Sequence, residues 1–150
     1  MDQHPRLATR DDVSVVEDVV KAAYAHYVSR IGRKPAPMLD DYGALIEQGR
    51  VYVLEHVGVV KGILVLIPEE HSMLLDNVAV VPEAQGSGLG RRLLEFAEHR
   101  AISQGYCWIR LYTNELMAEN IALYSHIGYS ETHRSDDKGF KRVYMSKRLG

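Results

Sequence analysis

A glycine-rich loop between an apolar strand and a helix constrains the fold of this sequence more than any other feature. Residues 73–81 are rich in apolar and β-branched side chains and end at Pro82. Gly86, Gly88 and Gly90 follow, and behind them apolar residues recur at helical spacing up to Gly105. Another strand is predicted at residues 107–112. A strand, helix and strand in this order predict a parallel pair joined by a right-handed crossover.

The rest of the chain predicts a mixed sheet. Apolar residues at steps of three and four predict a helix over residues 13–31, and a short helix over 40–48 follows a loop with two prolines. Two β-branched runs flank Val57-Gly58 and predict an antiparallel hairpin. The expected order is a short strand near Leu7, the two helices, strands at 51–56, 59–67 and 73–81, a helix at 89–105, a strand at 107–112, a helix at 117–127, and strands at 129–133 and 140–147. We expect one α/β domain over residues 1–150, a twisted mixed sheet of about seven strands flanked by four helices.

Composition and charge exclude several classes of function. The 150 residues are 46% hydrophobic and 25% charged with a net charge of -2, which is typical of a globular domain. The sequence contains no Lys/Arg cluster of the kind that binds nucleic acid, and no His/Cys cluster of the kind that binds a metal ion. The longest apolar run, residues 63–67, is far short of the roughly 20 residues that span a membrane. The single Cys107 and the lack of an exporting segment at the start favour the cytoplasm.

The glycine loop is suited to a phosphate group. Glycines let successive backbone N–H groups converge, and the following helix adds its N-terminal donors. ATP or GTP is disfavoured because Gly90 is followed by Arg91 rather than by the Lys-Ser/Thr pair of a P-loop. NAD and FAD are disfavoured because the next strand carries no acidic residue. For the glycines taken alone, a tight turn that only lets the helix approach the sheet is the alternative.

Two segments resemble motifs of the GNAT N-acetyltransferase superfamily. Residues 77–90, NVAVVPEAQGSGLG, are similar to its acyl-CoA-binding motif, a strand ending in V-x-P followed by Q/R-x-x-G-x-G/A. Residues 120–129, NIALYSHIGY, resemble its N-x-A-L-Y-x-x-x-G-F/Y segment. The resemblance covers roughly the whole chain and is weakest in the first third. It implies the acyl-CoA N-acyltransferase fold and acetyl-CoA as co-substrate.

The resemblance also implies how the co-substrate would be held. Arg91 would add charge beside a backbone cradle for the pyrophosphate, formed by Gln85, Gly86, Ser87, Gly88, Leu89 and Gly90. Gln85 stands where many members have arginine. A bulge would splay one strand from its neighbour and free backbone groups for the pantetheine amides, on Val78, Ala79 and Val80. The Val80 N–H would face the thioester oxygen in an oxyanion-hole role.

Two side chains would complete the transfer machinery. By the resemblance, Asn120 would bind the coenzyme A arm, and Tyr124 would act as general acid for the departing thiolate. A purely structural aromatic is the alternative for Tyr124. Asp76 lies beside the expected cleft and is a candidate general base, with a loop-holding role as its alternative. Asn77 is expected on the opposite face of the strand, so that only one of the two faces the cleft.

The acceptor site is the least determined part. In this superfamily the region between the first two helices forms one wall, which here contains Tyr27, Arg30, Arg33, Met38 and Tyr42. An arginine there would pair with an acceptor carboxylate, or the loop is simply a solvated basic segment. Tyr112 and Thr113 would line the opposite wall.

The resulting function is N-acetyl transfer from acetyl-CoA to a primary amine of a small molecule or protein. The superfamily uses direct attack in a ternary complex, so Cys107 is not needed as a nucleophile and is expected to be a small buried residue of a central strand. Another acyl-CoA is an open alternative, and so is a non-catalytic acyl-CoA sensor or partner-binding module. A homodimer through the terminal strands fits the superfamily.

Overall fold

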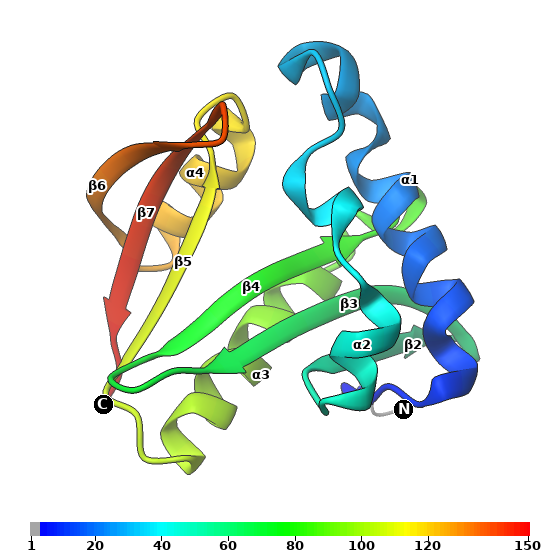
Figure 1. The fold of residues 1–150 in the computed structure, drawn as a ribbon. Coiled ribbons are helices and arrows are strands. Elements are labelled where there is room, and N and C mark those ends of the chain that lie inside the picture. Colours follow the sequence, from blue (N-terminus) through cyan, green and yellow to red (C-terminus); the bar gives the residue numbers. More distant parts are fainter. Residues whose placement is uncertain (1–3) are drawn as a thin grey trace.

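The computed structural model describes residues 4–150 as a seven-stranded sheet with two helices on each face (Figure 1). The strand order is β1-β2-β3-β4-β5-β7-β6, and every neighbouring pair is antiparallel except β4 and β5. The strands are β1 (Arg6–Leu7), β2 (Val51–His56), β3 (Val59–Pro68), β4 (Met73–Val80), β5 (Trp108–Asn114), β6 (Ser130–Asp137) and β7 (Phe140–Arg148). The helices are α1 (Val13–Ile31), α2 (Tyr42–Glu47), α3 (Leu89–Ser103) and α4 (Ala118–His126). The predicted α/β fold and element order are confirmed.

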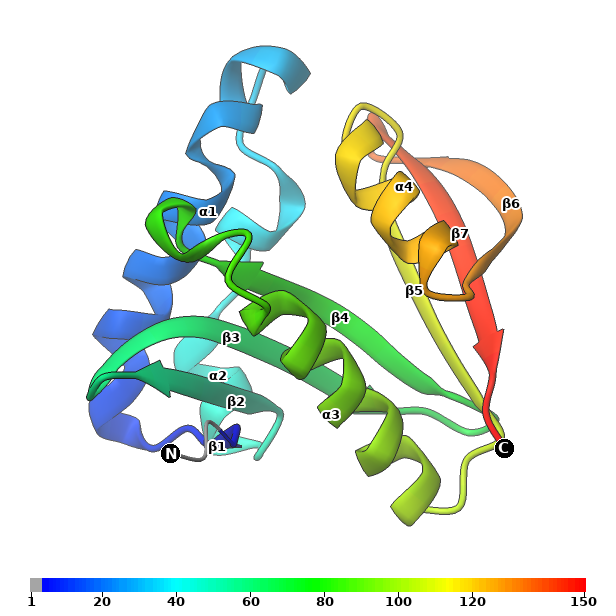
Figure 2. The same cartoon turned by 180° about the vertical axis from the view of Figure 1, so that it is seen from behind.

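The helices cover the sheet because their apolar faces must leave water. In α1, buried residues such as Val16, Val20 and Ala23 follow the three-and-four spacing, and the helix ends at Gly32 with a φ of 88°. Figure 2 shows α3 and α4 on the opposite face, where α3 packs against β3, β4 and β5. Its residues Leu93 and Ala97 are fully buried. None of the helices within residues 4–150 is long and apolar enough to cross a membrane.

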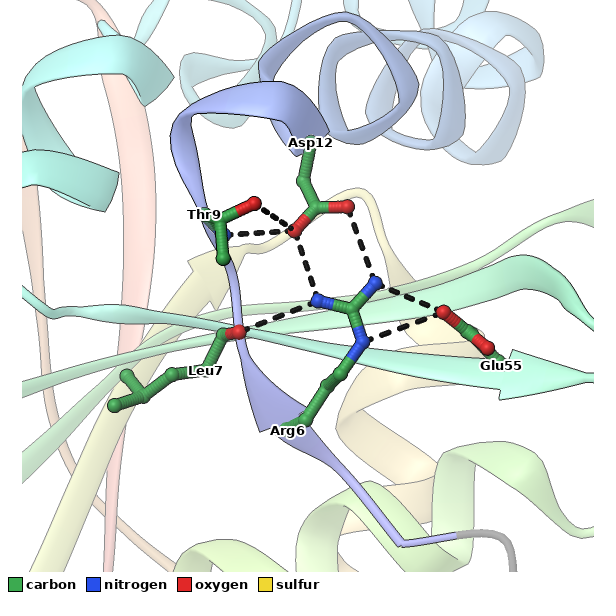
Figure 3. A network of polar contacts seen from close by, with 5 residues as sticks. All are labelled: Arg6, Leu7, Thr9, Asp12 and Glu55. Carbon is green, nitrogen blue, oxygen red and sulfur yellow. Dashed lines mark hydrogen bonds and ion pairs between the residues drawn. The ribbon is translucent and has the colours of Figure 1, made fainter.

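A polar network fixes the start of the chain to the sheet. The Arg6 guanidinium lies between two carboxylates, 2.9 Å from Asp12 Oδ2 and 2.8 Å from Glu55 Oε2 (Figure 3). The Asp12 carboxylate also accepts a hydrogen bond from the Thr9 N–H at 2.7 Å, which joins the short strand to the turn that precedes α1. This network lowers the pKa of Asp12 from 3.8 to about 2, chiefly through the hydrogen bond with Arg6.

Several element boundaries differ from the prediction. The loop expected between α1 and α2 contains a 3-10 turn, η2 (Ala36–Leu39), because the prolines fix φ in the helical region. Strand β5 begins at Trp108 and runs to Asn114, so Cys107 precedes it. The expectation that Cys107 is a buried strand residue is therefore wrong, since its side chain is exposed.

Candidate active site

The central feature of the site is the open side of β4. Strand β4 pairs with β5 only over Met73–Leu75, and within residues 4–150 the two strands have no further pairing (Figure 1). On its other side β4 stays paired with β3 up to Val80. The Val81 N–H donates to the Lys61 carbonyl at 2.9 Å, so the backbone alternation directs the Val80 N–H away from β3, toward the opening.

A β-bulge marks the point where the strands part. Asn77 pairs with Val65 and Leu75 pairs with Leu66, so Asp76 is an extra residue without a partner on β3. The prediction that Asp76 and Asn77 occupy opposite faces is wrong for this reason: the extra residue breaks the two-residue alternation, and both contribute to the wall of one cavity. The resemblance implied a bulge that splays the strand at Val78, Ala79 and Val80, and the bulge lies at Asp76, just before these residues.

The glycine loop opens a cavity of about 450 Å³ between the N-terminus of α3, the open edge of β4 and helices α1 and α4. Gly86 and Gly88 have φ values of 82° and 89°, which L-residues rarely adopt, and a Cβ on either glycine would meet open space. The loop is braced by the Gln85 amide, which donates to the Val80 carbonyl at 3.1 Å, and by the Ser87 hydroxyl, which donates to the Ala84 carbonyl. The other lining residues include Val78, Ala79, Val80, Gly90 and Arg91.

This cavity fits the coenzyme that the family resemblance implies. Backbone N–H groups at a helix start provide donors for a pyrophosphate, and the open space at Gly86 and Gly88 leaves room for its oxygens. The Arg91 side chain lies near Glu95 at 3.8 Å and is largely exposed, so it is close to the loop without being fixed in it. Beyond the loop, the open backbone of Val78 and Val80 continues in the direction of α4.

A second, smaller cavity of about 90 Å³ adjoins the first. Four residues line both cavities: Tyr24, Val78, Asn120 and Tyr124. The smaller cavity lies between the proline turn, the bulge of β4 and the ends of β5 and β7. It has room for a few water molecules or one small polar group. An acyl group held in the large cavity would therefore meet a small group from the other side near Tyr124.

Tyr124 has the geometry of a proton donor. Its side chain is buried, and its ring packs edge-on against Tyr129 with centroids 5.8 Å apart. Among residues 4–150 its hydroxyl has no hydrogen-bond partner. Burial raises the pKa of Tyr124 above that of an ordinary tyrosine, so the hydroxyl keeps its proton at neutral pH. Asn120, one turn earlier on α4, contacts the Met117 sulfur through its amide nitrogen at 3.6 Å.

The smaller cavity is acidic on one side. The Tyr112 hydroxyl donates to Asp76 Oδ1 at 3.1 Å, and burial raises the pKa of Asp76 despite this hydrogen bond. Asp40, at the rim, has its pKa raised to about 6 by desolvation and by the nearby Asp76 charge. Arg142 also lines the cavity, but it stacks over the Tyr112 ring at 4.1 Å and pairs with Asp137 at 3.0 Å.

Buried hydrogen bonds hold this wall in place. Asn77 Oδ1 accepts from the Tyr24 hydroxyl at 2.6 Å, and its amide donates to the Tyr42 hydroxyl at 2.9 Å. The Tyr42 hydroxyl in turn donates to the Pro37 carbonyl. The network joins α1, α2, β4 and the proline turn, so Asn77 and Tyr42 hold this wall of the site in position.

The structure brings together only part of the predicted acceptor wall. Tyr112 and Thr113 line the small cavity, as expected for the opposite wall, while Tyr27 lines the large one. Arg30 pairs with Glu119 at 2.7 Å, and Arg33 donates to the Lys138 carbonyl and lies 3.6 Å from the centroid of the Phe140 ring. Neither arginine lines the large or the small cavity, and Met38 packs against the core. The two arginines instead tie α1 and the loop after it to α4 and the β6–β7 turn, and pairing of either with an acceptor carboxylate stays a prediction.

The residues of the small cavity that escaped the sequence reasoning include Tyr24, Asp40, Asn114, Phe140 and Arg142. Asn114 and Arg142 are partners across β5 and β7, a pairing that only the register reveals. Asp40 lies three residues after Pro37, close to the two-proline segment, but nothing in the sequence indicated that this turn folds over Asp76.

Comparisons with known proteins agree with this geometry. Residues 47–131, more than half of the chain, match the sequence model of the acetyltransferase (GNAT) domain family. The chain is 36% identical over 67 residues to mycothiol acetyltransferase of Jonesia denitrificans and 33% identical over 64 residues to mouse N-alpha-acetyltransferase 80. These matches cover 45% and 43% of this chain, but only 21% and 19% of the two relatives.

A solved structure shows the same fold over its full length. The PaiA N-acetyltransferase of Thermoplasma acidophilum, crystallised with coenzyme A, superposes with a TM-score of 0.80 and 16% identity, covering 99% of this chain and all of that one. The likeness extends to the first third of the chain, outside the family match at residues 47–131. The family match, the glycine loop and the opened strand together place this chain in the GNAT acetyltransferase family.

Proposed function

We propose that this protein transfers the acetyl group of acetyl-CoA to a primary amine of a small molecule or protein by direct attack in a ternary complex. The observation that carries the proposal is the pair of adjoining cavities that share Tyr24, Val78, Asn120 and Tyr124. One is lined by the glycine loop, and the other contains a carboxylate at the strand bulge. A thioester and an amine that enter from opposite sides would meet beside the Tyr124 hydroxyl.

Each part of the large cavity has a role in holding acetyl-CoA. The pyrophosphate would lie on the backbone of the loop, formed by Gln85, Gly86, Ser87, Gly88, Leu89 and Gly90, with Arg91 nearby. The pantetheine amides would bond to the open backbone of Val78, Ala79 and Val80, and Asn120 would bind the arm near its end. The Val80 N–H would stabilise negative charge that develops on the thioester oxygen.

We assign the two proton transfers to Asp76 and Tyr124, the two groups near the shared wall whose pKa values are raised by burial. The amine must be neutral to attack, and Asp76 is the candidate acceptor of its proton, directly or through water, because its carboxylate lines the small cavity. A carbon–nitrogen bond forms as the carbon–sulfur bond breaks, and Tyr124 protonates the departing thiolate. The raised pKa of Tyr124 supports a donor role and disfavours a base role.

The small cavity also limits the acceptor. At about 90 Å³, it accepts the amine and its nearest atoms and leaves a larger acceptor outside, past Asp40 and the proline turn. Tyr112 and Thr113 would line the amine's path from β5. The homodimer that the family resemblance implies would form through the edge strand β6 or its neighbours.

The proposal is tested by measuring coenzyme A release from acetyl-CoA with a panel of small primary amines, peptides and protein N-termini. We expect amine-dependent release that stops when the large cavity is blocked at Gly88. Longer acyl-CoAs in the same assay define the acyl preference. Tight acetyl-CoA binding without release for any amine would refute the enzymatic proposal and favour an acyl-CoA sensor.

A further inference from the structure

A third cavity lies at the other end of α3, away from the glycine loop. It has a volume of about 290 Å³ and is lined by the turn between α2 and β2, by the ends of the first four strands and by the last turns of α3. Arg100 lies 12 residues beyond Gly88, which corresponds to about 18 Å along the helix axis. The cavity is therefore separate from the proposed coenzyme site (Figure 2).

Two arginines line this cavity without a partner. Arg50 Nη1 and Arg100 Nε are buried and have no hydrogen-bond acceptor. No carboxylate within residues 4–150 pairs with either guanidinium, and no acidic residue of that part of the chain lines the cavity. Six other arginines of the chain do lie beside a carboxylate. Arg50 and Arg100 differ from these six in that no carboxylate of the described part of the chain lies beside them.

Two cations that line one cavity repel each other unless an anion lies between them. Because Arg50 Nη1 and Arg100 Nε are closed to solvent, such an anion would bind the other nitrogens of the two guanidinium groups. The planar guanidinium binds carboxylate and phosphate oxygens in a paired geometry. The remaining wall is largely apolar and includes Tyr52, Leu66 and Met73, which suits a ligand with an apolar part.

We propose that this cavity binds a small organic anion. Its carboxylate or phosphate head lies between Arg50 and Arg100, and its apolar part packs against Tyr52, Leu66 and Met73. The Arg50 backbone is fixed by the hydrogen bond that its carbonyl accepts from the Leu66 N–H at 2.9 Å, so one side of the site is preformed. This site is independent of acetyl transfer.

The test is calorimetric titration of the full chain with four probes at constant ionic strength: acetate, phenylacetate, inorganic phosphate and phenyl phosphate. We expect each phenyl compound to bind more tightly than its counterpart without the ring, and the stronger of the two phenyl compounds identifies the head group. Arg50→Gln and Arg100→Gln should each raise the Kd about tenfold or more, because a charge-assisted hydrogen bond is lost.

A matched control separates this site from general charge effects. Arg10→Gln removes the same charge from an exposed position outside the cavity and should leave the Kd unchanged. The Kd for acetyl-CoA should be the same in all variants. Both cavity variants should keep the wild-type Tm or raise it, because they remove a buried N–H without an acceptor.

Several results would overturn the proposal. These are an absence of binding by all four probes, binding that survives both cavity variants, and an equal loss of binding in Arg10→Gln. Equal affinity for acetate and phenylacetate, together with equal affinity for the two phosphates, would contradict an apolar contact. A dimer that dissociates on Arg50→Gln, with no anion affinity in the wild type, would show that a second copy covers the cavity instead.

Discussion

Replacing Tyr124 by Phe separates a proton donor from a structural aromatic. The change keeps the ring that packs at 5.8 Å from Tyr129 and removes only the hydroxyl. Because that hydroxyl has no partner within residues 4–150, its removal breaks no hydrogen bond. We expect the free energy of unfolding to change by less than about 1 kcal/mol and the Kd for acetyl-CoA to stay the same.

The expected loss is in the chemical step. A general acid contributes about 10²-fold to 10⁴-fold to the rate, so kcat for coenzyme A release should fall by about 10²-fold or more, equivalent to roughly 2.7 kcal/mol of activation free energy. The pKa of Tyr124 is raised by burial, so the phenol loses its proton only above the usual tyrosine range. A basic limb of the rate profile below about pH 10 therefore belongs to another group.

Tyr129→Phe is the matched control. Tyr129 is the ring partner of Tyr124, and its own hydroxyl is also buried without an acceptor, yet it lines neither cavity. Its removal should leave kcat unchanged and leave stability unchanged or slightly higher. Near-normal kcat in Tyr124→Phe, or an equal loss in both variants, would refute the general-acid assignment.

Three further predictions concern the loop, the bulge and the N-terminal network. Gly88→Val places a β-branched residue at a φ of 89° and a side chain in the cavity, so calorimetry should show weakened acetyl-CoA binding, more than for Gln85→Ala, whose amide braces the loop only from the side. Asp76→Asn should lower kcat/KM and remove the acid limb of its pH profile, which in the wild type lies above the ordinary aspartate pKa because burial disfavours the charged form. Arg6→Gln should lower the free energy of unfolding by about 1 to 2 kcal/mol at pH 7, a value reduced for the exposure of the Arg6 side chain, and denaturant titration measures it. The folded pKa of Asp12 is about 2 against 3.8 unfolded, so this contribution is present above pH 4 and is lost as the pH falls from 4 to 2.

Each of these has a contrary result. Equal acetyl-CoA affinity in Gly88→Val and the wild type would remove the phosphate site from the loop. An unchanged acid limb in Asp76→Asn would assign the base elsewhere, with Asp40 at the rim as the next candidate. A stability difference for Arg6→Gln that persists at pH 2 would show that the network acts through packing rather than charge.

Local sequence patterns predicted most of the fold, because helix faces, helix ends and turns depend mainly on residues that are close in the sequence. The spacing of Val16, Val20 and Ala23 places one face of α1 against the sheet whatever the partner is, and Gly32 ends the helix by its positive φ. The turn at Val57-Gly58 similarly joins β2 to β3, with φ values of 54° and 77°. The glycine loop and its helix followed from the same kind of evidence.

The site was harder to predict because its geometry depends on register and on distant partners. The bulge at Asp76 is visible only when β4 is aligned with β3, and a two-residue alternation therefore gave the wrong relation between Asp76 and Asn77. The sequence did not reveal the partners of Arg30 and Arg33. These are Glu119 and the Lys138 carbonyl, which lie about 90 and 105 positions away along the chain. Cys107 was misplaced because the strand begins one residue later than its apolar pattern.

Direct transfer between the two adjoining cavities is best tested by initial rates of coenzyme A release with acetyl-CoA and the amine both varied. We expect intersecting lines in a double-reciprocal plot and no acetylated protein when acetyl-CoA is added without an amine, since the exposed Cys107 lines neither cavity. Parallel lines, together with an acetylated side chain found by mass spectrometry and able to pass its acetyl group to the amine, would contradict it.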